Sequence, residues 1–291
     1  MNNKLKWTYR FTDTFLYPIA YYVVRYRRTV VRKNLVSSFP ELSQDEIVHL
    51  EKQFYHHFSD IVAEVLFASH ASKNELAECI EFIGLDDVEK KAALHGGVIY
   101  MLGHLGNWEL TADVQHRYLS PNLQHYNVYR KLNNYRFNQF MQQIRERMSG
   151  EGSSIEKQSL LRKMIQLKHL NQPHTIGLIS DQKPRPEVTR FWCDFLHQDT
   201  GWLDGGDVLA RKFGYPVFYV HMSQLKRGHY VAHPQLITDD PTNTPDNYIT
   251  EQFVQRLESN IRENPSLWLW SHNRWKWGRS GKVQEAGTLN S

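Results

Sequence analysis

At 291 residues the chain is long enough to bury a substantial core in one large domain, or in one domain with an appendage. Its formal net charge is only +4, although that charge is unevenly distributed. The two cysteines, Cys79 and Cys193, form neither a close pair nor a metal-ligand spacing, so we expect a reducing compartment. The 15 histidines contain no H-E-x-x-H pattern, and we interpret them as dispersed surface and core residues rather than as a metal site.

Residues 8–36 are predicted to be helical and contain an apolar run followed by a basic cluster. The run, residues 15–24, is too short to span a bilayer, which needs about 20 residues, and Pro18 interrupts it. It is not a signal peptide, because no small-residue cleavage site follows it. Apolar side chains beside cations suit a segment that lies in a membrane interface, but they also suit an amphipathic helix that packs on the core. The cations of the cluster are Arg25, Arg27, Arg28, Arg32 and Lys33.

Two capping boxes predict where the next two helices begin. The first helical segment ends at residues 39–40, where phenylalanine precedes proline. Ser43 and Glu46 then have the spacing of a capping box for a second helix, which runs to about Ala68. Residues 72–75 repeat this spacing.

From residue 80 onward strand and helix patterns alternate, which predicts an α/β fold with a mixed sheet flanked by helices and a helical N-terminal region packed on it. We expect a single domain over residues 1–291, helical in 1–79 and α/β in 80–291. The strand candidates lie near residues 80–83, 98–102, 123–129, 174–180, 216–222 and 229–237, and the helix candidates near 85–94, 108–119, 134–148, 158–170, 203–213 and 245–264.

Residues 98–110 have the pattern of a buried strand, a glycine-containing loop and a helix. Asn107 is a good N-cap for that helix. His104 would lie in the loop at the carboxyl end of the strand, which is the edge where open α/β sheets bind ligands. Glu109, in the first helical turn, could reach back to the imidazole, fix its tautomer and stabilise the imidazolium. This stretch therefore predicts a general base at His104.

The spacing of His104 and Glu109 is weak support by itself. With 15 histidines and 31 acidic residues, a chain of this length contains about two such pairs by chance. The sequence has two, and the other, His70 with Glu75, straddles a helix break and follows no strand. We interpret that second pair as surface or cap chemistry. From its spacing alone, His104 fits a core histidine as well as a base.

Two further strands end in polar residues. The strand over residues 175–180 leads into Asp181 and Gln182, which reach the edge of His104 if the two strands are parallel. There they could orient a substrate hydroxyl or a cationic neighbour, although an aspartate can also merely cap the loop. Arg130 ends the strand over residues 124–129. Arg145 follows on a helix, where an arginine either binds a phosphate or carboxylate or is simply solvated.

The C-terminal residues 268–277 hold four of the eight tryptophans, interleaved with Arg274 and Lys276. Such a stretch could stack bases, form an interfacial belt or pack over the sheet edge. No nucleic-acid motif supports the first interpretation.

Taken together, these residues resemble the lipid A biosynthesis acyltransferase family, the late lauroyl and myristoyl transferases that act on Kdo-lipid A precursors in Gram-negative bacteria. The resemblance spans nearly the whole chain, and its specificity comes from the order and spacing of short motifs. These are Tyr26-Arg27-Arg28 with Asn34-Leu35 and Phe39-Pro40-Glu41, Gly103-His104 through Glu109-Leu110, Val128-Tyr129-Arg130, Arg145-Glu146-Arg147, Asp181-Gln182, Gly214-Tyr215-Pro216-Val217 and Trp270-Ser271-His272-Asn273-Arg274-Trp275-Lys276.

The resemblance implies an acyltransferase-like α/β fold, with His104 and Glu109 as the catalytic pair. It gives Arg145 and Asp181 functional roles around that pair, with Arg130 and Gln182 as substrate-binding neighbours. We expect transfer of a fatty acyl chain from an acyl carrier protein thioester to a hydroxyl of a lipid A precursor.

The alternative is a related acyltransferase with a lysophospholipid or aminolipid acceptor. We expect no cofactor, no metal and no nucleic-acid partner. The expected partners are acyl carrier protein, an anionic glycolipid acceptor and a membrane surface, and the expected location is the cytoplasmic face of the inner membrane, with peripheral or interfacial attachment.

Overall fold

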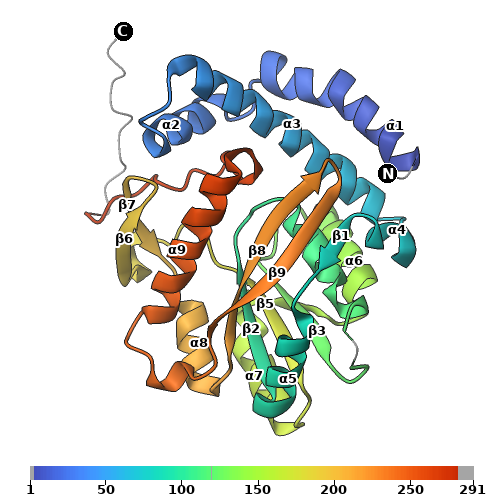
Figure 1. Ribbon diagram of the computed structural model, residues 1–291, viewed down its shortest axis with the longest axis vertical. Coiled ribbons are helices and arrows are strands. Elements are labelled where there is room, and N and C mark those ends of the chain that lie inside the picture. The colour runs from blue at the N-terminus through green and yellow to red at the C-terminus, as the bar shows by residue number, and fades with distance from the viewer. Residues whose placement is uncertain (1–2, 119, 281–291) are drawn as a thin grey trace.

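A seven-stranded mixed sheet forms the centre of the computed structural model, which describes residues 3–118 and 120–280 (Figure 1). The strand order is β1-β9-β8-β2-β5-β3-β4, and β1 and β9 run antiparallel to the other strands of this sheet. A separate hairpin is formed by β6 and β7. The strands are β1 (Ile80–Phe82), β2 (Gly97–Leu102), β3 (Gln124–Tyr129), β4 (Ser154–Glu156), β5 (His174–Ile179), β6 (Phe191–Phe195), β7 (Gln198–Trp202), β8 (Val217–Lys226) and β9 (His229–Thr238).

Helices surround this sheet, and the predicted fold class is confirmed. Helices α8 and α9 pack against each other, α8 also contacts β2, and α9 contacts β8. Helix α6 packs on β3 and on a 3₁₀ helix, Trp108–His116. The α-helices are α1 (Asn3–Phe11), α2 (Arg28–Ser38), α3 (Gln44–Ala68), α4 (Lys73–Ala77), α5 (Leu85–His95), α6 (Tyr135–Ser149), α7 (Leu160–His169), α8 (Gly205–Phe213) and α9 (Tyr248–Glu263).

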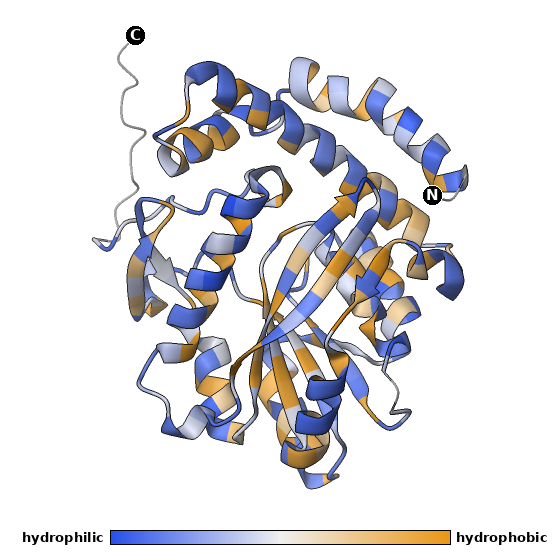
Figure 2. Cartoon of the chain, in the orientation of Figure 1, coloured by the Kyte–Doolittle hydropathy of each residue, from blue (hydrophilic) through white to orange (hydrophobic). Residues whose placement is uncertain are grey.

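The central strand β2 is the buried strand that the sequence predicts. All six of its residues are buried, because β5 and β8 flank it as parallel neighbours. Figure 2 shows the central strands as predominantly hydrophobic. Continuous apolar runs of this kind are typical of parallel strands that are covered on both faces.

The N-terminal helices lie across one end of the sheet, at the top of Figure 1. Both predicted capping boxes are present, at Ser43 with Glu46 and at Ser72 with Glu75. The helix expected over residues 8–36 is interrupted. Two π-helical segments flank Pro18, which lacks the N–H that a regular helix needs, and Arg25 and Arg27 adopt positive φ angles of 52°.

The basic cluster at residues 25–33 is not a uniformly solvated face. Arg28 and Arg32 both pair with the carboxylate of Glu51, which is fully buried on α3. Arg27 donates a hydrogen bond from Nη1 to the backbone oxygen of Ser271, at 3.1 Å. Part of the cluster therefore anchors the N-terminal segment to the rest of the protein.

The hairpin β6–β7 was not predicted from the sequence, and its turn explains why. Leu196 and His197 form this turn with φ angles of 50° and 61°. Tight hairpin turns with positive φ usually contain glycine, asparagine or aspartate, so the sequence carried no turn signal at this point. The three-residue strand β4 was also missed, because it is too short to show an alternating pattern.

Within the described residues, no helix is both long enough and apolar enough to cross a bilayer.

Candidate functional site

The carboxyl ends of β2 and β5 meet at one edge of the sheet, as the sequence predicts. The two strands are parallel, with Leu102 and Ile179 in register, so the residues that follow both strands are neighbours. Gly103 allows close packing at this junction. A Cβ atom there would lie 3.2 Å from Oδ2 of Asp181 and only 2.6 Å from Cδ1 of Leu257.

Asp181 holds His104 by two hydrogen bonds. Nδ1 of the His104 ring lies 2.6 Å from Oδ1 of Asp181, and the His104 backbone N–H donates to Oδ2 at 2.8 Å. The indole Nε1 of Trp268 donates to the same Oδ2 at 2.9 Å. Asp181 is 2% exposed, so these donors replace the water that would otherwise solvate the carboxylate.

The charges and hydrogen bonds of His104 and Asp181 determine where their protons lie. Burial by itself would raise the pKa of the Asp181 carboxyl, but the neighbouring His104 ring and the hydrogen bonds hold that pKa well below its usual range. Burial likewise opposes protonation of His104, yet Asp181 outweighs it and Glu109 adds to the effect, so the pKa of the imidazole is raised. Because an ionised carboxylate only accepts hydrogen bonds, Nδ1 of His104 carries the proton and Nε2 is left as the basic nitrogen.

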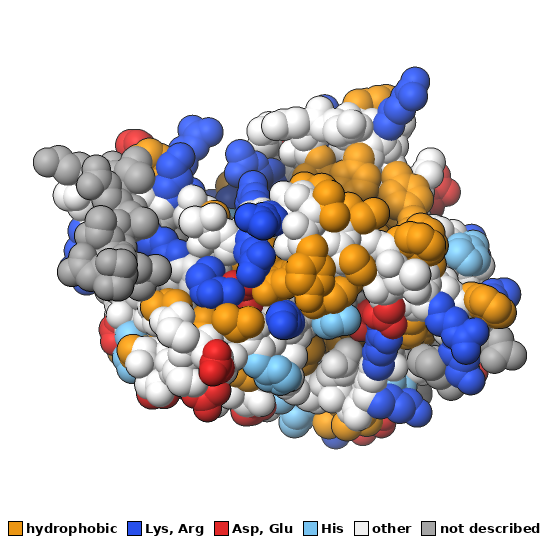
Figure 3. Space-filling model, turned by 90° about the horizontal axis from the view of Figure 1, so that it is seen from above, with side chains coloured by type: hydrophobic (Ala, Val, Ile, Leu, Met, Phe, Trp, Pro, Cys, Tyr) orange, Lys and Arg blue, Asp and Glu red, His pale blue; other side chains and the backbone are white. Residues whose placement is uncertain are grey.

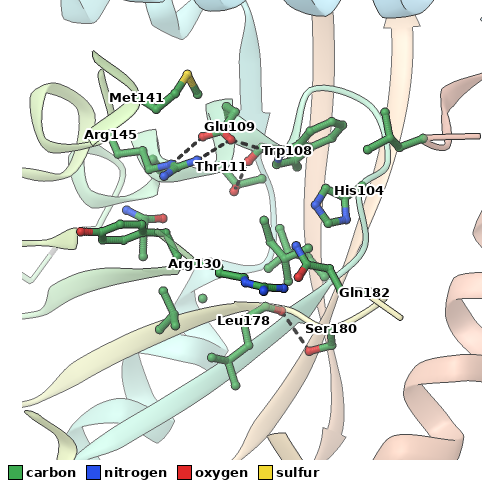
Figure 4. A pocket seen from close by; sticks show the side chains of 18 of the residues that line it. His104, Trp108, Glu109, Thr111, Arg130, Met141, Arg145, Leu178, Ser180 and Gln182 are labelled. Atoms are coloured by element: carbon green, nitrogen blue, oxygen red, sulfur yellow. Dashed lines mark hydrogen bonds and ion pairs between the residues drawn. The ribbon is translucent and has the colours of Figure 1, made fainter. Parts of the chain in front are cut away.

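The expected contact between Glu109 and His104 is not formed, and this part of the prediction was wrong. The carboxylate of Glu109 instead accepts two hydrogen bonds from Arg145, from Nε and from Nη2, each at 2.7 Å. Nε1 of Trp108 donates to Glu109 at 3.2 Å, and the Trp108 ring lies edge-on to His104 with a centroid distance of 4.8 Å. Trp108 thus lies between the histidine and the Glu109–Arg145 pair (Figure 4).

The type of helix that follows the loop explains why Glu109 does not reach His104. Residues 108–116 form a 3₁₀ helix rather than the expected α-helix, and Asn107 does not cap it with its side chain. A 3₁₀ helix has 3.0 residues per turn instead of 3.6, so a side chain in its first turn points in a different direction.

The C-terminal segment closes the site from the other side. The backbone N–H of Gly106 donates to the oxygen of Leu267, and the N–H of Leu269 donates to the oxygen of His104, both at 3.0 Å. Trp268, Trp270 and Trp275 are buried, so most of the tryptophan-rich stretch packs into the core, which is nearest to the interpretation that it packs over the sheet edge. The contact of Trp268 with Asp181 was not foreseen, because only the fold brings these residues together.

A cavity of about 1000 Å³ opens beside His104. Arg130, Arg145 and Gln182 line it, so the fold brings all the candidate site residues to the cavity or to its edge (Figure 4). Of the described residues that line it, five are lysine or arginine and only Glu109 is acidic. Its apolar lining includes Leu102, Ala112, Val128, Leu132, Phe137, Phe140, Met141, Leu160, Leu178, Leu209 and Val220.

In residues 3–118 and 120–280 no cluster of three or more histidine, cysteine, aspartate or glutamate side chains is arranged to hold a metal ion.

The mixed sheet, the histidine–carboxylate pair at its edge and the adjoining apolar cavity together suit an α/β acyltransferase. The chain belongs to the bacterial lipid A biosynthesis acyltransferase family, whose model matches residues 6–277. This match confirms the resemblance found in the sequence, and acyl transfer in lipid A biosynthesis is the general activity that it indicates. A comparison with curated proteins found no match.

The pair of His104 and Asp181 predicts a pH-dependent contribution to stability. The raised pKa of His104 gives stabilisation that is complete below its unfolded value of about 6.5 and is lost as the pH rises through the folded pKa. The lowered pKa of Asp181 gives stabilisation that is present above its unfolded value of about 3.9 and is lost as the pH falls. Asp181→Asn should therefore lower the free energy of unfolding more at about pH 5.5 than at about pH 8.5, as measured by urea denaturation.

Asp207→Asn is the matched control. Asp207 is also buried, but its side chain pairs with the guanidinium of Arg211 and not with a histidine. Its effect should be similar at both pH values. An equal loss of stability at the two pH values for Asp181→Asn would contradict the ion pair with His104.

Proposed function

We propose that the protein transfers a fatty acyl chain from an acyl carrier protein thioester to a hydroxyl group of a lipid A precursor. The observation that carries this proposal is the basic Nε2 of His104, oriented by Asp181 at the edge of an apolar cavity. We infer further that the protein acts at the cytoplasmic face of the inner membrane, where the acceptor lies.

The chemistry proceeds by direct transfer. Nε2 of His104 removes the proton of the acceptor hydroxyl as its oxygen attacks the thioester carbonyl. The tetrahedral intermediate then expels the thiol sulfur, which takes the proton from the imidazolium, so an ester replaces the thioester and the histidine returns to its neutral form. Asp181 keeps the ring in place throughout and stabilises its positive charge. General base catalysis of this kind contributes about 10²–10⁴ in rate, so positioning and stabilisation of the oxyanion supply the rest.

Glu109 and Arg145 have supporting roles in this reaction. Glu109 lies near enough to favour the charged form of His104, although it makes no hydrogen bond to the ring. Arg145 fixes that carboxylate through two parallel bonds. We assign Glu109 to stabilisation of the imidazolium and Arg145 to positioning of Glu109 and to the electrostatics of the cavity.

The cavity lining suits both the apolar acyl chain and the charged parts of the proposed substrates. Its aliphatic and aromatic side chains suit an acyl chain, which gains about 0.8 kcal/mol for each buried CH₂ group. Its excess of cations suits an anionic acceptor and an acidic carrier protein. Arg130 and Gln182 project into this space, and we assign them to substrate binding.

An exposed apolar stripe on the N-terminal helices supports attachment to a membrane. Trp7, Phe11, Phe15, Ile19 and Val23 are all exposed and follow one another at intervals of four residues along α1 and the π-helical segments. Figure 3 looks onto this end of the molecule and shows hydrophobic patches with lysine and arginine side chains beside them. Aromatic side chains next to cations are typical of a helix that lies in the interface. The adjoining Tyr26 and Arg27 line the cavity, so a lipid on that surface would be next to the cavity.

The function itself is tested by turnover of purified protein on a matrix of donors and acceptors. We expect transfer from acyl carrier protein thioesters to a lipid A precursor, with esterification of a hydroxyl that mass spectrometry can locate. Transfer only to a lysophospholipid or an aminolipid would replace the proposed acceptor, and transfer only from coenzyme A would replace the proposed donor. Absence of transfer in every combination would contradict the proposed function.

Substitutions separate the roles of the two carboxylates. Asp181→Asn should lower kcat by about 10²-fold or more and move the acidic limb of the pH–rate profile to lower pH, because the group that raises the pKa of His104 most is gone. Glu109→Gln should lower kcat less and move this limb only slightly, and His104→Ala should remove base catalysis. An unshifted limb in Asp181→Asn, or a larger shift in Glu109→Gln, would reverse the two roles.

Removal of the exposed stripe should weaken membrane binding. We expect the triple variant Phe11→Ser, Phe15→Ser and Ile19→Ser to bind anionic vesicles at least about tenfold more weakly than the unaltered protein, because three apolar side chains no longer enter the interface. Leu94→Ser with Leu170→Ser is the control, since both leucines are exposed but belong to the α5 and α7 region at the opposite end of Figure 1. Equal vesicle affinity for the triple variant and the unaltered protein would rule out this surface.

A further inference from the structure

A carboxylate is buried behind the loop that carries His104. Glu64, on α3, is 1% exposed and does not line the cavity. It belongs to the buried face of this helix together with Phe54, His57, Ile61 and Ala68. A carboxylate in this apolar stripe costs desolvation free energy that a leucine would not, so its presence needs a reason other than packing.

The contacts of Glu64 join the catalytic loop to two other elements. Nδ2 of Asn107, in the loop, donates to Oε2 at 2.8 Å. The hydroxyl of Tyr9, on α1, donates to Oε1 at 2.5 Å. The hydroxyl of Tyr230, on β9, reaches both carboxylate oxygens, at 3.2 and 3.0 Å. One carboxylate therefore accepts hydrogen bonds from three segments that are distant in the sequence.

The back of the loop rests on the same group of side chains. Gly106 has a φ of +60°, and a Cβ atom there would lie 3.2 Å from the Tyr230 ring, so the backbone packs directly on that tyrosine. The buried His57 ring lies against the backbone of Gly106, and burial lowers its pKa to about 4, so it is neutral near neutral pH. Among the described residues, the side chain of Asn107 has one hydrogen-bond partner, which is Glu64.

We propose that Glu64 is a positioning residue that fixes the loop of His104 through Asn107. Through Tyr9, it also makes the position of that loop depend on how α1 packs against α3. This inference rests on the proposed function for its effect on catalysis. The link matters because the outer face of α1 carries Trp7 and Phe11, part of the exposed apolar stripe, whereas its inner face carries Tyr9. Contact of α1 with a membrane would thus be transmitted to the loop by two hydrogen bonds.

The test compares two isosteric substitutions on the same helix. Glu64→Gln keeps the size of the side chain but removes its charge, and its amide nitrogen can only donate. The bond to Asn107 is therefore lost or, if the Asn107 amide turns round, becomes a weaker bond between neutral groups. Glu51→Gln is the control: it is also a fully buried carboxylate of α3, but it pairs with Arg28 and Arg32 of α2 and does not touch the loop. Hydrogen–deuterium exchange of residues 103–109 reports on the loop without any substrate, so it does not depend on the proposed function.

We expect Glu64→Gln to speed exchange of the loop amides by about tenfold, the effect of losing one buried hydrogen bond, and to lower kcat by about the same factor with little change in KM. Glu51→Gln should leave exchange in the loop unchanged. Tyr9→Phe removes only the donor on α1 and should speed exchange in the loop by a smaller factor. Unchanged exchange in residues 103–109 for both Glu64→Gln and Tyr9→Phe would overturn the proposal.

A double variant in which the carboxylate and the amide exchange places, called the exchanged pair, separates positioning of the loop from general destabilisation. In Glu64→Gln with Asn107→Asp, the glutamine nitrogen can donate to the new aspartate while its oxygen still accepts from the tyrosines. This double variant should restore slow exchange in the loop, and most of kcat, relative to Glu64→Gln alone. If Glu64→Gln does not fold, the exchanged pair and Tyr9→Phe still test the link. A double variant no better protected than Asn107→Asp alone would contradict it.

Discussion

The interaction on which the site depends is the hydrogen-bonded ion pair between His104 and Asp181. A carboxylate that is 2% exposed is tolerated only if donors surround it, and here they come from the His104 ring, the His104 backbone and Trp268. This requirement accounts for neighbouring features. The two strands are parallel and in register, a Cβ atom at Gly103 would crowd Asp181 and Leu257, and the C-terminal segment returns to the loop of His104. One buried charge therefore connects the centre of the sheet to Trp268 in the C-terminal segment.

Much of this arrangement could be predicted from the sequence, because it depends on local patterns. The apolar run before His104 predicted a buried strand, and Ser43 and Ser72 predicted two helix starts. The sequence placed Asp181 near His104 only if the two strands are parallel, and the hydrogen bond between them could not be predicted in this way. The spacing of His104 and Glu109 suggests a contact only if an α-helix follows the loop, whereas the 3₁₀ helix turns Glu109 toward Arg145. Similarly, Glu64 occupies an apolar stripe of α3, which was a visible signal of an unusual buried charge, but only the fold shows what it binds.

The layers of the molecule give a physical order to these interactions. Helix α1 carries exposed apolar side chains on its outer face and Tyr9 on its inner face, and α3 lies beneath it with Glu64. The loop of His104 follows, and then the cavity, whose lining is apolar along the sheet and cationic among its charged groups. The exposed apolar side chains of α1, the buried carboxylate of Glu64 and the loop of His104 are thus linked by direct contacts.

The most direct test of the central claim is nuclear magnetic resonance of the protein labelled with ¹⁵N in its histidine rings, with His104→Gln used to assign the signals of His104. We expect the neutral ring to carry its proton on Nδ1 and to titrate with a pKa above the ordinary value of about 6.5. Asp181→Asn should lower this pKa and release the preference for the Nδ1–H form, while Glu109→Gln should leave the tautomer unchanged. A neutral ring protonated on Nε2, or a tautomer that changes with Glu109→Gln and not with Asp181→Asn, would contradict the assignment of Asp181 as the residue that holds the base.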